Sequence, residues 1–342
     1  MGASFTDSLR LVAGNAKPTS LPTGSSPGFK GDKKAALKVL AKTGPKLADL
    51  QERLFAAGRT GDKRRILMVL QGMDTSGKGG TIKHVTGMLS PQGLSIASFK
   101  APTLEERSHD FLWRVRRALP EPGLIGVFDR SHYEDVLIVR VHELAPRSTW
   151  YSRYESINNF EADLAEDGVT VIKCFLHVSP EVQRARLLAR LDDPTKYWKY
   201  NPADVDERGF WSEYAAAYDD ALTRCSTDAA PWFVIPSDHK WYRNLAVSQL
   251  LLEHLESLDL KWPRPDFDAD SEKLRLRAPH VDPIEPAGKH PATAKRAGKA
   301  RKRQQVKGSA VPGRAEASVP PGSNGRPSAA LAAKKRRGSA SI

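Results

Sequence analysis

The sequence predicts an α/β fold: a three-layer sandwich in which helices cover both faces of a mostly parallel sheet. Two observations support this prediction. Five apolar strand-like runs alternate with segments of helix length. The first run, residues 66–71, breaks into a glycine-rich turn that leads into helix-forming residues. Because parallel strands end at the same edge of a sheet, we expect Gly72, Lys100 and Asp129 to gather at that edge.

The predicted elements follow from hydrophobic periodicity. Residues 33–58 carry leucines at helical spacing but are interrupted by Gly44 and Pro45, which predicts two helices before the first strand. Strands are then expected at 66–71, 94–99, 124–128, 169–176 and 232–235. Helices are expected at 78–89, 104–118, across 132–143 and 148–166, and at 180–191, 204–224 and 239–258.

Composition divides the 342 residues into three parts. Residues 1–31 are rich in Gly, Ser and Pro and read as a flexible leader. Residues 32–265 form the expected folded domain. Residues 266–342 are expected to be a disordered basic tail, because they contain too few large apolar residues to offset the entropy of ordering.

The net charge of +13 is confined to this tail. From Pro286 onward there are 14 Lys and Arg and one acidic residue, whereas the rest of the chain is neutral overall. Nucleic acid is therefore an unlikely partner for the folded domain. The tail could bind nucleic acid or another polyanion, or could be a solvated segment that aids solubility, and both alternatives stay open.

The chain has no apolar run long enough to span a bilayer and no signal-peptide core near Met1. Two cysteines, Cys174 and Cys225, are too few for a disulfide framework or a metal cluster. We therefore expect a cytoplasmic protein without a membrane partner.

The motif Gly72 to Gly80, Gly-Met-Asp-Thr-Ser-Gly-Lys-Gly-Gly, follows the first predicted strand. A strand that breaks into glycines, a lysine and then a helix exposes backbone N–H groups around an anion. We interpret it as a phosphate cradle that uses Gly72, Gly77, Lys78, Gly79 and Gly80. The alternative is a glycine-rich turn in which an aspartate caps the next helix.

Two acids are candidate magnesium ligands. The hydroxyl residue that usually follows the lysine of such a loop and binds magnesium is replaced by Gly79, while Asp74 lies inside the loop. A carboxylate beside phosphates requires a cation between them. Asp129, which ends the strand at 124–128, would supply the second contact. For Asp129 alone, a helix N-cap is the competing interpretation.

Several cations could bind further phosphates. Arg130 follows Asp129 directly, and Arg140 lies in an apolar stretch where it needs a phosphate or a carboxylate such as Glu134 or Asp135. Lys100 ends the second strand. Residues 184–208 place basic side chains around a proline-broken helix end, which suggests either a lid over the phosphates or an exposed helix with solvated charges. The lid candidates are Arg190, Lys196 and Lys199.

Three motifs together resemble the polyphosphate kinase 2 family. They are Gly72-Met-Asp-Thr-Ser-Gly-Lys-Gly-Gly80, Phe128-Asp-Arg-Ser-His-Tyr-Glu-Asp135 and Arg190-Leu-Asp-Asp-Pro-Thr-Lys-Tyr-Trp-Lys199, within a likeness that runs from about residue 33 to 262. The resemblance implies a P-loop kinase fold of the thymidylate-kinase type with a helical lid. It also implies that Asp74 and Asp129 bind magnesium, that Lys78 is the loop lysine, and that Arg130 and Arg190 hold phosphates at the reacting centre.

The activity implied by this resemblance is reversible, magnesium-dependent phosphoryl transfer between inorganic polyphosphate and a nucleotide (AMP, ADP or GDP). The motif at residues 132–135 is similar to that of members that accept nucleoside monophosphates as well as diphosphates. A homo-oligomer is expected from the family alone. The alternatives are an ATP-dependent nucleoside or nucleotide kinase, and a polyanion-binding protein with a vestigial loop.

Overall fold

The computed structural model describes residues 4–12 and 17–278. The strands are β1 Arg65–Gln71, β2 Leu94–Ser98, β3 Ile125–Asp129, β4 Val169–His177 and β5 Trp232–Pro236. The α-helices are α1 Phe5–Leu9, α2 Lys33–Arg59, α3 Lys78–Thr86, α4 Leu104–Arg107, α5 Trp113–Arg117, α6 Ile138–Val141, α7 Arg147–Glu166, α8 Pro180–Leu191, α9 Ala203–Glu207, α10 Trp211–Arg224, α11 Lys240–Ser257 and α12 Ala269–Arg277. Short 3₁₀ helices are η1 Pro18–Ser20, η2 Pro91–Gly93, η3 His132–Asp135, η4 Pro194–Lys199 and η5 Arg208–Phe210.

The five strands form one sheet in the order β2-β3-β1-β4-β5, and every named pair is parallel. The predicted α/β class and parallel sheet are confirmed. The register pairs Leu70 with Asp129, so the end of β3 lies beside the end of β1. Phe99 donates its N–H to the carbonyl of Asp129 over 3.0 Å, which brings the end of β2 to the same edge. Gly72, Lys100 and Asp129 thus follow three neighbouring strands, as expected.

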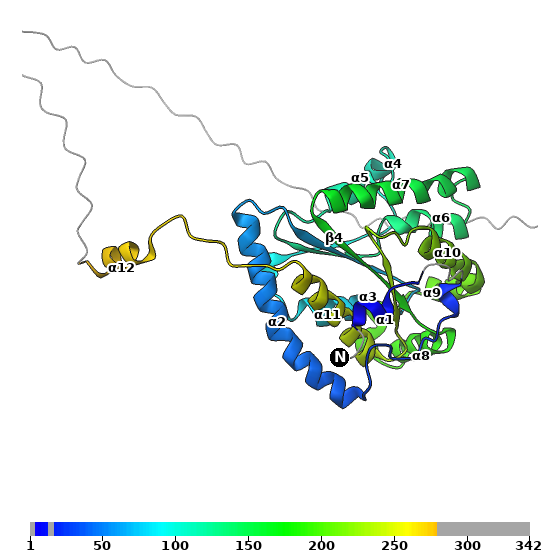
Figure 1. Ribbon diagram of the computed structural model, residues 1–342. Helices are drawn as coiled ribbons and strands as arrows, with labels where there is room; N and C mark the ends of the chain where they lie inside the picture. Colours follow the sequence, from blue (N-terminus) through cyan, green and yellow to red (C-terminus); the bar gives the residue numbers. More distant parts are fainter. Residues whose placement is uncertain (1–3, 13–16, 279–342) are drawn as a thin grey trace, which may run out of the picture. The chain divides into compact units, whose positions relative to one another are not determined.

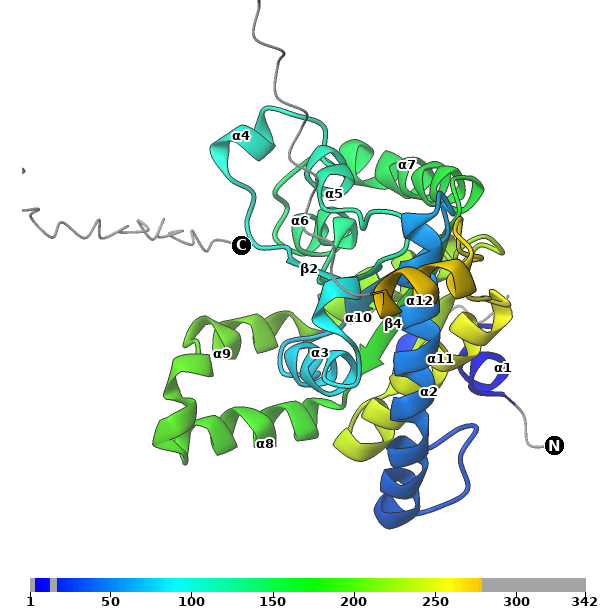
Figure 2. The ribbon, with the colours of Figure 1, turned by 90° about the vertical axis from the view of Figure 1, so that its left-hand side faces the viewer.

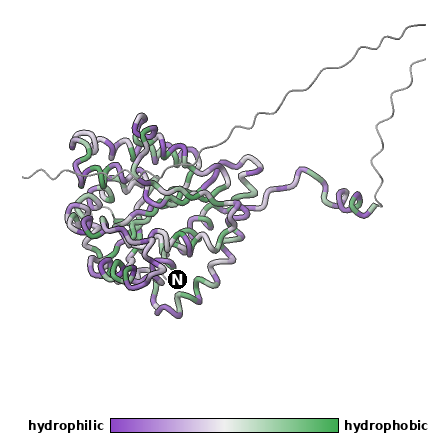
Figure 3. The backbone as a smooth tube through the Cα atoms, turned by 180° about the vertical axis from the view of Figure 1, so that it is seen from behind, coloured by the Kyte–Doolittle hydropathy of each residue, from purple (hydrophilic) through white to green (hydrophobic). Residues whose placement is uncertain are grey.

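Alternate residues of β1 face two separate cores, which is why the strand is a continuous apolar run. Ile66, Met68 and Leu70 pack with α1, α2, α3 and α11 on one face of the sheet. Leu67 and Val69 pack on the other face, which α5, α7 and α10 cover. Figure 1 shows these two helical layers on either side of the strands, and Figure 3 shows that hydrophobic residues occur both in the centre of the domain and at intervals along the surrounding helices. Both faces of the sheet are therefore buried at β1, as is typical of a parallel sheet covered by helices.

Residues 33–59 form one helix of 27 residues, α2, and not the two helices predicted from Gly44 and Pro45. Its buried residues recur at helical spacing on both sides of the proline, so one continuous face packs on the core: Ala36, Thr43, Leu47, Gln51, Leu54 and Ala57. Pro45 and Ala41 are both exposed. Proline has no N–H, so the carbonyl of Ala41 has no helical hydrogen-bond partner and can bond to water instead. Packing outweighs the local cost of the proline.

The expectation of a flexible leader does not match the packing of residues 4–12. Phe5, Leu9 and Leu11 are buried. Glu253 of α11 accepts the backbone N–H groups of Phe5 and Thr6 over 2.9 and 2.8 Å. The N–H of Leu11 donates to the carbonyl of Trp232 over 2.8 Å, and Arg10 and Phe233 form an antiparallel bridge. Three apolar side chains spaced along a short segment are enough to anchor it to α11 and β5.

The predicted disordered tail, residues 266–342, falls mostly outside the described residues. Within the described part, residues 269–277 form α12, which differs from the expected disorder. None of its residues is buried, so the helix is formed by local interactions such as the ion pair between Lys273 and Asp270 at 2.8 Å.

Candidate active site

Residues 72–77 connect the end of β1 to the start of α3, and we call this segment the phosphate loop. Lys78 folds back over it, and its Nζ donates to the carbonyls of Gly72 and Met73 over 2.8 and 3.4 Å. Gly72 and Gly77 have φ angles of +149° and +110°. A Cβ on Gly72 would lie 2.6 Å from the carbonyl oxygen of Leu176. These two positions therefore need glycine. That the loop binds phosphate stays a prediction.

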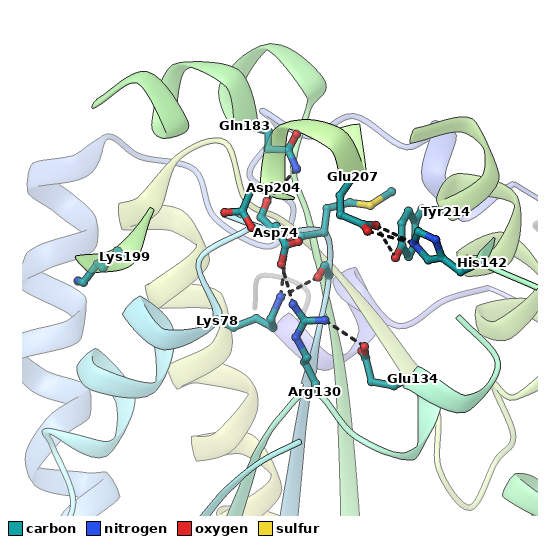
Figure 4. A network of polar contacts seen from close by, with 12 residues as sticks. Asp74, Lys78, Arg130, Glu134, His142, Gln183, Lys199, Asp204, Glu207 and Tyr214 are labelled. Carbon is teal, nitrogen blue, oxygen red and sulfur yellow. Dashed lines mark hydrogen bonds and ion pairs between the residues drawn. The ribbon is translucent and has the colours of Figure 1, made fainter. Parts of the chain in front are cut away.

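Arg130 joins the phosphate loop to the end of β3. Its Nη2 contacts Asp74 Oδ1 at 2.7 Å, and its Nη1 contacts Glu134 Oε2 at 3.0 Å. We call these three side chains the Arg130 network (Figure 4). Burial disfavours the charged guanidinium, but Glu134 and Asp74 outweigh that effect and raise the pKa of Arg130. Arg130 has a φ of +65°, a strained conformation for arginine that points the side chain toward the loop.

The two candidate metal ligands both act on Lys78. Burial and Arg130 lower the pKa of Lys78, while Asp74, Asp129 and Glu134 oppose this. The carboxylates of Asp74 and Asp129 thus both lie near Lys78, and Asp74 forms an ion pair with Arg130. Within residues 4–12 and 17–278, no three His, Cys, Asp or Glu side chains form a metal site on their own. Two carboxylates suit magnesium, which usually takes one or two from the protein and completes its shell with water and phosphate.

The predicted lid consists of α8, η4 and α9, which extend beyond the sheet in Figure 2. Arg190 Nη1 donates to the carbonyl of Lys199 over 2.8 Å and to Asp204 Oδ2 over 3.3 Å. Burial and the nearby Asp74 raise the pKa of Asp204, which places this lid carboxylate close to the phosphate loop. The lid therefore brings an acid as well as an arginine to the site.

Similarity to known proteins identifies the family of this chain. The model of the family described as polyphosphate kinase 2 matches residues 30–263. The chain belongs to the polyphosphate kinase 2 family. It is 46% identical over 246 residues to an AMP/ADP-polyphosphate phosphotransferase of Meiothermus ruber, covering 72% of this chain and 90% of the relative. It is 43% identical over 244 residues to an ADP-polyphosphate phosphotransferase of Rhodopseudomonas palustris, covering 68% and 83%.

A solved structure shares the fold. The crystal structure of polyphosphate kinase 2 from Arthrobacter aurescens is 47% identical, superimposes with a TM-score of 0.79, and covers 80% of this chain and 97% of that one. The P-loop kinase architecture expected from the motifs is thereby confirmed.

Not every predicted phosphate-binding residue of this polyphosphate kinase 2 chain reaches the Arg130 network. Arg140 Nη1 pairs with Asp220 of α10 at 2.6 Å, and its guanidinium stacks on Trp150. Its partner is thus a carboxylate, but it is neither Glu134 nor Asp135. The sequence could not reveal this partner, because the packing of α10 on α6 is a tertiary contact. Lys100 is exposed.

The two lid lysines also stand apart from the network. Lys196 pairs with Asp193 at 2.6 Å, and Lys199 lies over the ring of Trp198. Figure 4 shows Lys199 well separated from Asp74 and Arg130. Roles for these two residues in phosphate binding stay predictions.

Sequence reasoning missed the side chains that connect the lid to the phosphate loop and to the neighbouring helices. Gln183 of α8 donates to the carbonyl of Asp74 over 3.0 Å and in turn accepts a hydrogen bond from Arg208. Glu207 of α9 contacts His142 Nε2 at 3.0 Å and accepts the Tyr214 hydroxyl over 2.8 Å. No local signal marks Gln183 and Glu207, because the contacts of Gln183 with Asp74 and of Glu207 with His142 join segments that are distant in sequence.

A pocket lies between the phosphate loop, the lid and α10. Three aromatic residues of α10 line it together with charged groups of the site: Trp211, Tyr214, Tyr218, Asp74, Arg130, Glu134 and Glu207. The aromatic residues recur at intervals of three and four, which places them on one face of the helix. This spacing was the available sequence signal for the pocket.

A buried cluster supports the segment that carries Arg130. Lys173 of β4 and Glu161 of α7 are fully buried and paired at 2.5 Å. Glu161 also contacts His132 at 3.2 Å and accepts the Tyr133 hydroxyl over 2.9 Å. We call these four side chains the Lys173 cluster. It holds η3 from the core side, while Arg130 and Glu134 face the opposite side.

Within the described part of the chain, no helix has the length and apolar character needed to cross a membrane.

Proposed function

We propose that this chain transfers a phosphoryl group between inorganic polyphosphate and a nucleoside mono- or diphosphate, with Mg²⁺ as cofactor. The observation that supports this best is the convergence of Lys78, Arg130, Asp74 and Asp129 at the end of β1 and β3. Cations and carboxylates in this arrangement suit a phosphate chain held with a divalent ion. Relatives named for AMP, ADP and GDP as phosphoryl partners of polyphosphate support the substrate class.

In the proposed reaction, a terminal phosphate oxygen of the nucleotide attacks the end phosphorus of polyphosphate in line with the bond that breaks. The shortened polyphosphate leaves with the electron pair of that bond. Phosphate oxygens are already ionised near neutral pH, so no general base is required. Positioning and charge neutralisation then supply most of the rate.

The residues of the chain divide these tasks. The backbone N–H groups of the phosphate loop and Lys78 hold the phosphate that lies in the cradle. Arg130 and Arg190 neutralise charge that develops on the transferred group. Asp74 and Asp129 would hold Mg²⁺, which when bound screens the repulsion between phosphates and carboxylates. The lid excludes water when it closes.

We further propose that both AMP and ADP are acceptors, in line with the name of the relative that is 46% identical to this chain. The cytoplasmic location and the homo-oligomer stay predictions.

The deciding experiment incubates the protein with Mg²⁺, polyphosphate and AMP, ADP or GDP in parallel and follows the new nucleotides by chromatography. We expect ADP and ATP from AMP, and ATP from ADP. A matched reaction replaces polyphosphate with ATP as donor. Product formed only with ATP would contradict the proposal and favour the nucleotide-kinase alternative.

Deletion of residues 286–342 separates the enzyme from a tail-driven polyanion binder. We expect turnover to stay within about twofold, because the deleted segment lies outside the domain that carries the site. Loss of polyphosphate affinity together with turnover would instead assign the binding to the tail. Affinity is measured by calorimetry on both forms.

A further inference from the structure

A second arginine packs against the phosphate loop, and it is not among the residues that line the pocket described above. Arg243 is in the first turn of α11, and only 3% of it is exposed. Its Nη1 donates to the carbonyl of Ser76 over 3.1 Å, and its Nη2 donates to Asn244 Oδ1 over 3.0 Å. Within residues 4–12 and 17–278 it forms no ion pair with a carboxylate. The guanidinium is therefore a buried charge that only neutral oxygens contact.

The phosphate loop is shaped around this guanidinium. A Cβ on Gly77 would lie 1.8 Å from Arg243 Nη1, and a Cβ on Gly80 would lie 3.3 Å from Nη2. Any other residue at position 77 would displace the arginine. An added Cβ on Gly79, by contrast, would have nothing within 4 Å, so the first turn of α3 is open at that position.

The hydrogen bond to Ser76 orients the peptide that enters α3. Because a trans peptide carries its N–H opposite its C=O, a carbonyl of Ser76 that is directed at Arg243 turns the N–H of Gly77 toward the opposite side. In the proposed binding mode, the bound phosphate lies on that side. Arg243 thus holds one of the backbone donors of the cradle in position.

The charge of Arg243 is retained. Burial and the neighbouring Arg186 lower its pKa to about 10, so the guanidinium is protonated at neutral pH. Burying a charge without a counterion is costly, and a bound anion nearby reduces that cost. The positive charge also adds to the dipole at the start of α3.

Arg186 completes the support from the lid side. Its Nη1 donates to the carbonyls of Thr75 and Ser76 over 2.9 and 3.1 Å, and its Nη2 donates to the carbonyl of Ser237 over 2.6 Å. Arg186 belongs to α8, so it links the loop to the lid and to the end of β5. Arg243 differs from it in being deeply buried and in filling the space beside Gly77.

We propose that Arg243 is a positioning residue for phosphoryl transfer: it aligns the Gly77 N–H and supplies a fixed positive charge behind the bound phosphate. This inference rests on the proposed function of the phosphate loop. It predicts that phosphate affinity depends on Arg243 although the side chain does not reach the open side of the cradle.

The test compares Arg243→Gln and Arg243→Lys with the full-length protein. Gln keeps a donor but loses the charge, while Lys keeps the charge but loses the planar fork. Binding of inorganic tripolyphosphate is measured by calorimetry, and kcat and KM are measured with polyphosphate and ADP. We expect Gln to weaken tripolyphosphate binding about 10- to 100-fold and Lys to be intermediate, as for the loss of a charged hydrogen bond.

Arg65→Gln is the matched control. Arg65 is also buried, at 8% exposure, but it lies at the start of β1 and pairs with Asp167 at 2.5 Å, at the other end of the strand. We expect it to lose stability and to keep its tripolyphosphate affinity. All constants are measured well below the thermal midpoint of each variant.

Three outcomes would overturn the proposal. The first is that Arg243→Gln folds and binds tripolyphosphate with the affinity of the wild type. An equal loss of affinity in Arg65→Gln is the second. If Arg243→Gln does not fold, wild-type affinity in Arg243→Lys is the third. Failure of the proposed function itself is distinct, because the wild type would then neither bind tripolyphosphate nor transfer phosphate from polyphosphate to ADP.

Discussion

The Arg130 network and the Lys173 cluster are built from the same kinds of side chain, yet they differ in access to solvent. In the Arg130 network the side chains of Arg130, Asp74 and Glu134 are 36%, 29% and 13% exposed. In the Lys173 cluster Lys173 and Glu161 are completely buried. Both are connected through residues 129–135: Arg130 and Glu134 face the site, whereas His132 and Tyr133 face the core. A half-open network can exchange a carboxylate for a phosphate, whereas a sealed one can only hold the backbone.

The strongest test of this difference is Lys173→Met. Removing the lysine leaves Glu161 buried without its cation, which should lower the free energy of unfolding by about 3–5 kcal/mol. Denaturant unfolding measures this change. Lys261→Met, which breaks an exposed pair with Asp259, is the control and should cost less than about 1 kcal/mol.

Turnover of the folded fraction of Lys173→Met should stay within a few-fold of the wild type. An unchanged unfolding midpoint would show that the cluster does not stabilise the fold. Abolished turnover in molecules that are still folded would show that it belongs to the reaction.

Lys78→Ala and Asp129→Asn test the open side. Each removes one preorganised charge from the site, so turnover should fall on the order of 100-fold or more. Steady-state assays with polyphosphate and ADP measure the loss, and circular dichroism verifies the fold. Full activity in a correctly folded variant would refute the assigned role.

Arg190→Ala tests whether the lid takes part in the chemistry. Its contacts, Asp204 and the carbonyl of Lys199, lie within the lid and not in the core of the sheet, so the thermal midpoint should change by less than about 4 °C. Turnover should nevertheless fall on the order of 100-fold. Arg275→Ala removes an exposed arginine of α12 and should leave both quantities unchanged. A proportional loss of stability and turnover in Arg190→Ala would make the arginine structural.

The smallest expected effect is a change in how stability depends on pH. Burial alone would raise the pKa of Glu161, but Lys173 and His132 outweigh it and lower that pKa below its ordinary value of 4.5. The wild type therefore loses the stability that ionised Glu161 contributes as the pH falls below 4.5, because Glu161 of the unfolded state then binds a proton more readily than Glu161 of the folded state. In Lys173→Met burial prevails and raises the pKa, so acidification toward 4.5 should stabilise the variant. Unfolding curves between pH 7 and 4.5 with the same slope for both proteins would contradict this.

The parts of the site that sequence reasoning located are those encoded by contiguous residues. The phosphate loop is a strand, a glycine-rich turn and a helix in succession, and Asp129 and Arg130 directly follow an apolar strand. Backbone conformation and hydrophobic periodicity are local properties, so these positions can be read without knowing the partner of any side chain. The identity of Asp74 and Asp129 as metal ligands stays a prediction of the same kind.

The parts that were missed depend on pairs of distant residues. Arg140 finds Asp220 eighty residues further along the chain, and Gln183 finds the carbonyl of Asp74 from the lid. Arg243 looks like an ordinary residue at the start of a helix until α11 packs behind the phosphate loop. A charged side chain has many possible partners in a sequence, and burial together with packing selects one.

The sequence alone thus predicted the order of the strands, the position of the phosphate loop and the family motifs. Each of these is a short pattern of neighbouring residues with a local conformational cause. Which cations face the open site, which are neutralised elsewhere and which support the loop from behind depended on the folded arrangement. The same holds for the unbroken α2 and the anchored residues 4–12. In each case the burial of apolar surface, contributed by segments far apart in sequence, outweighed the local preference of a proline, a glycine-rich segment or a lone charge.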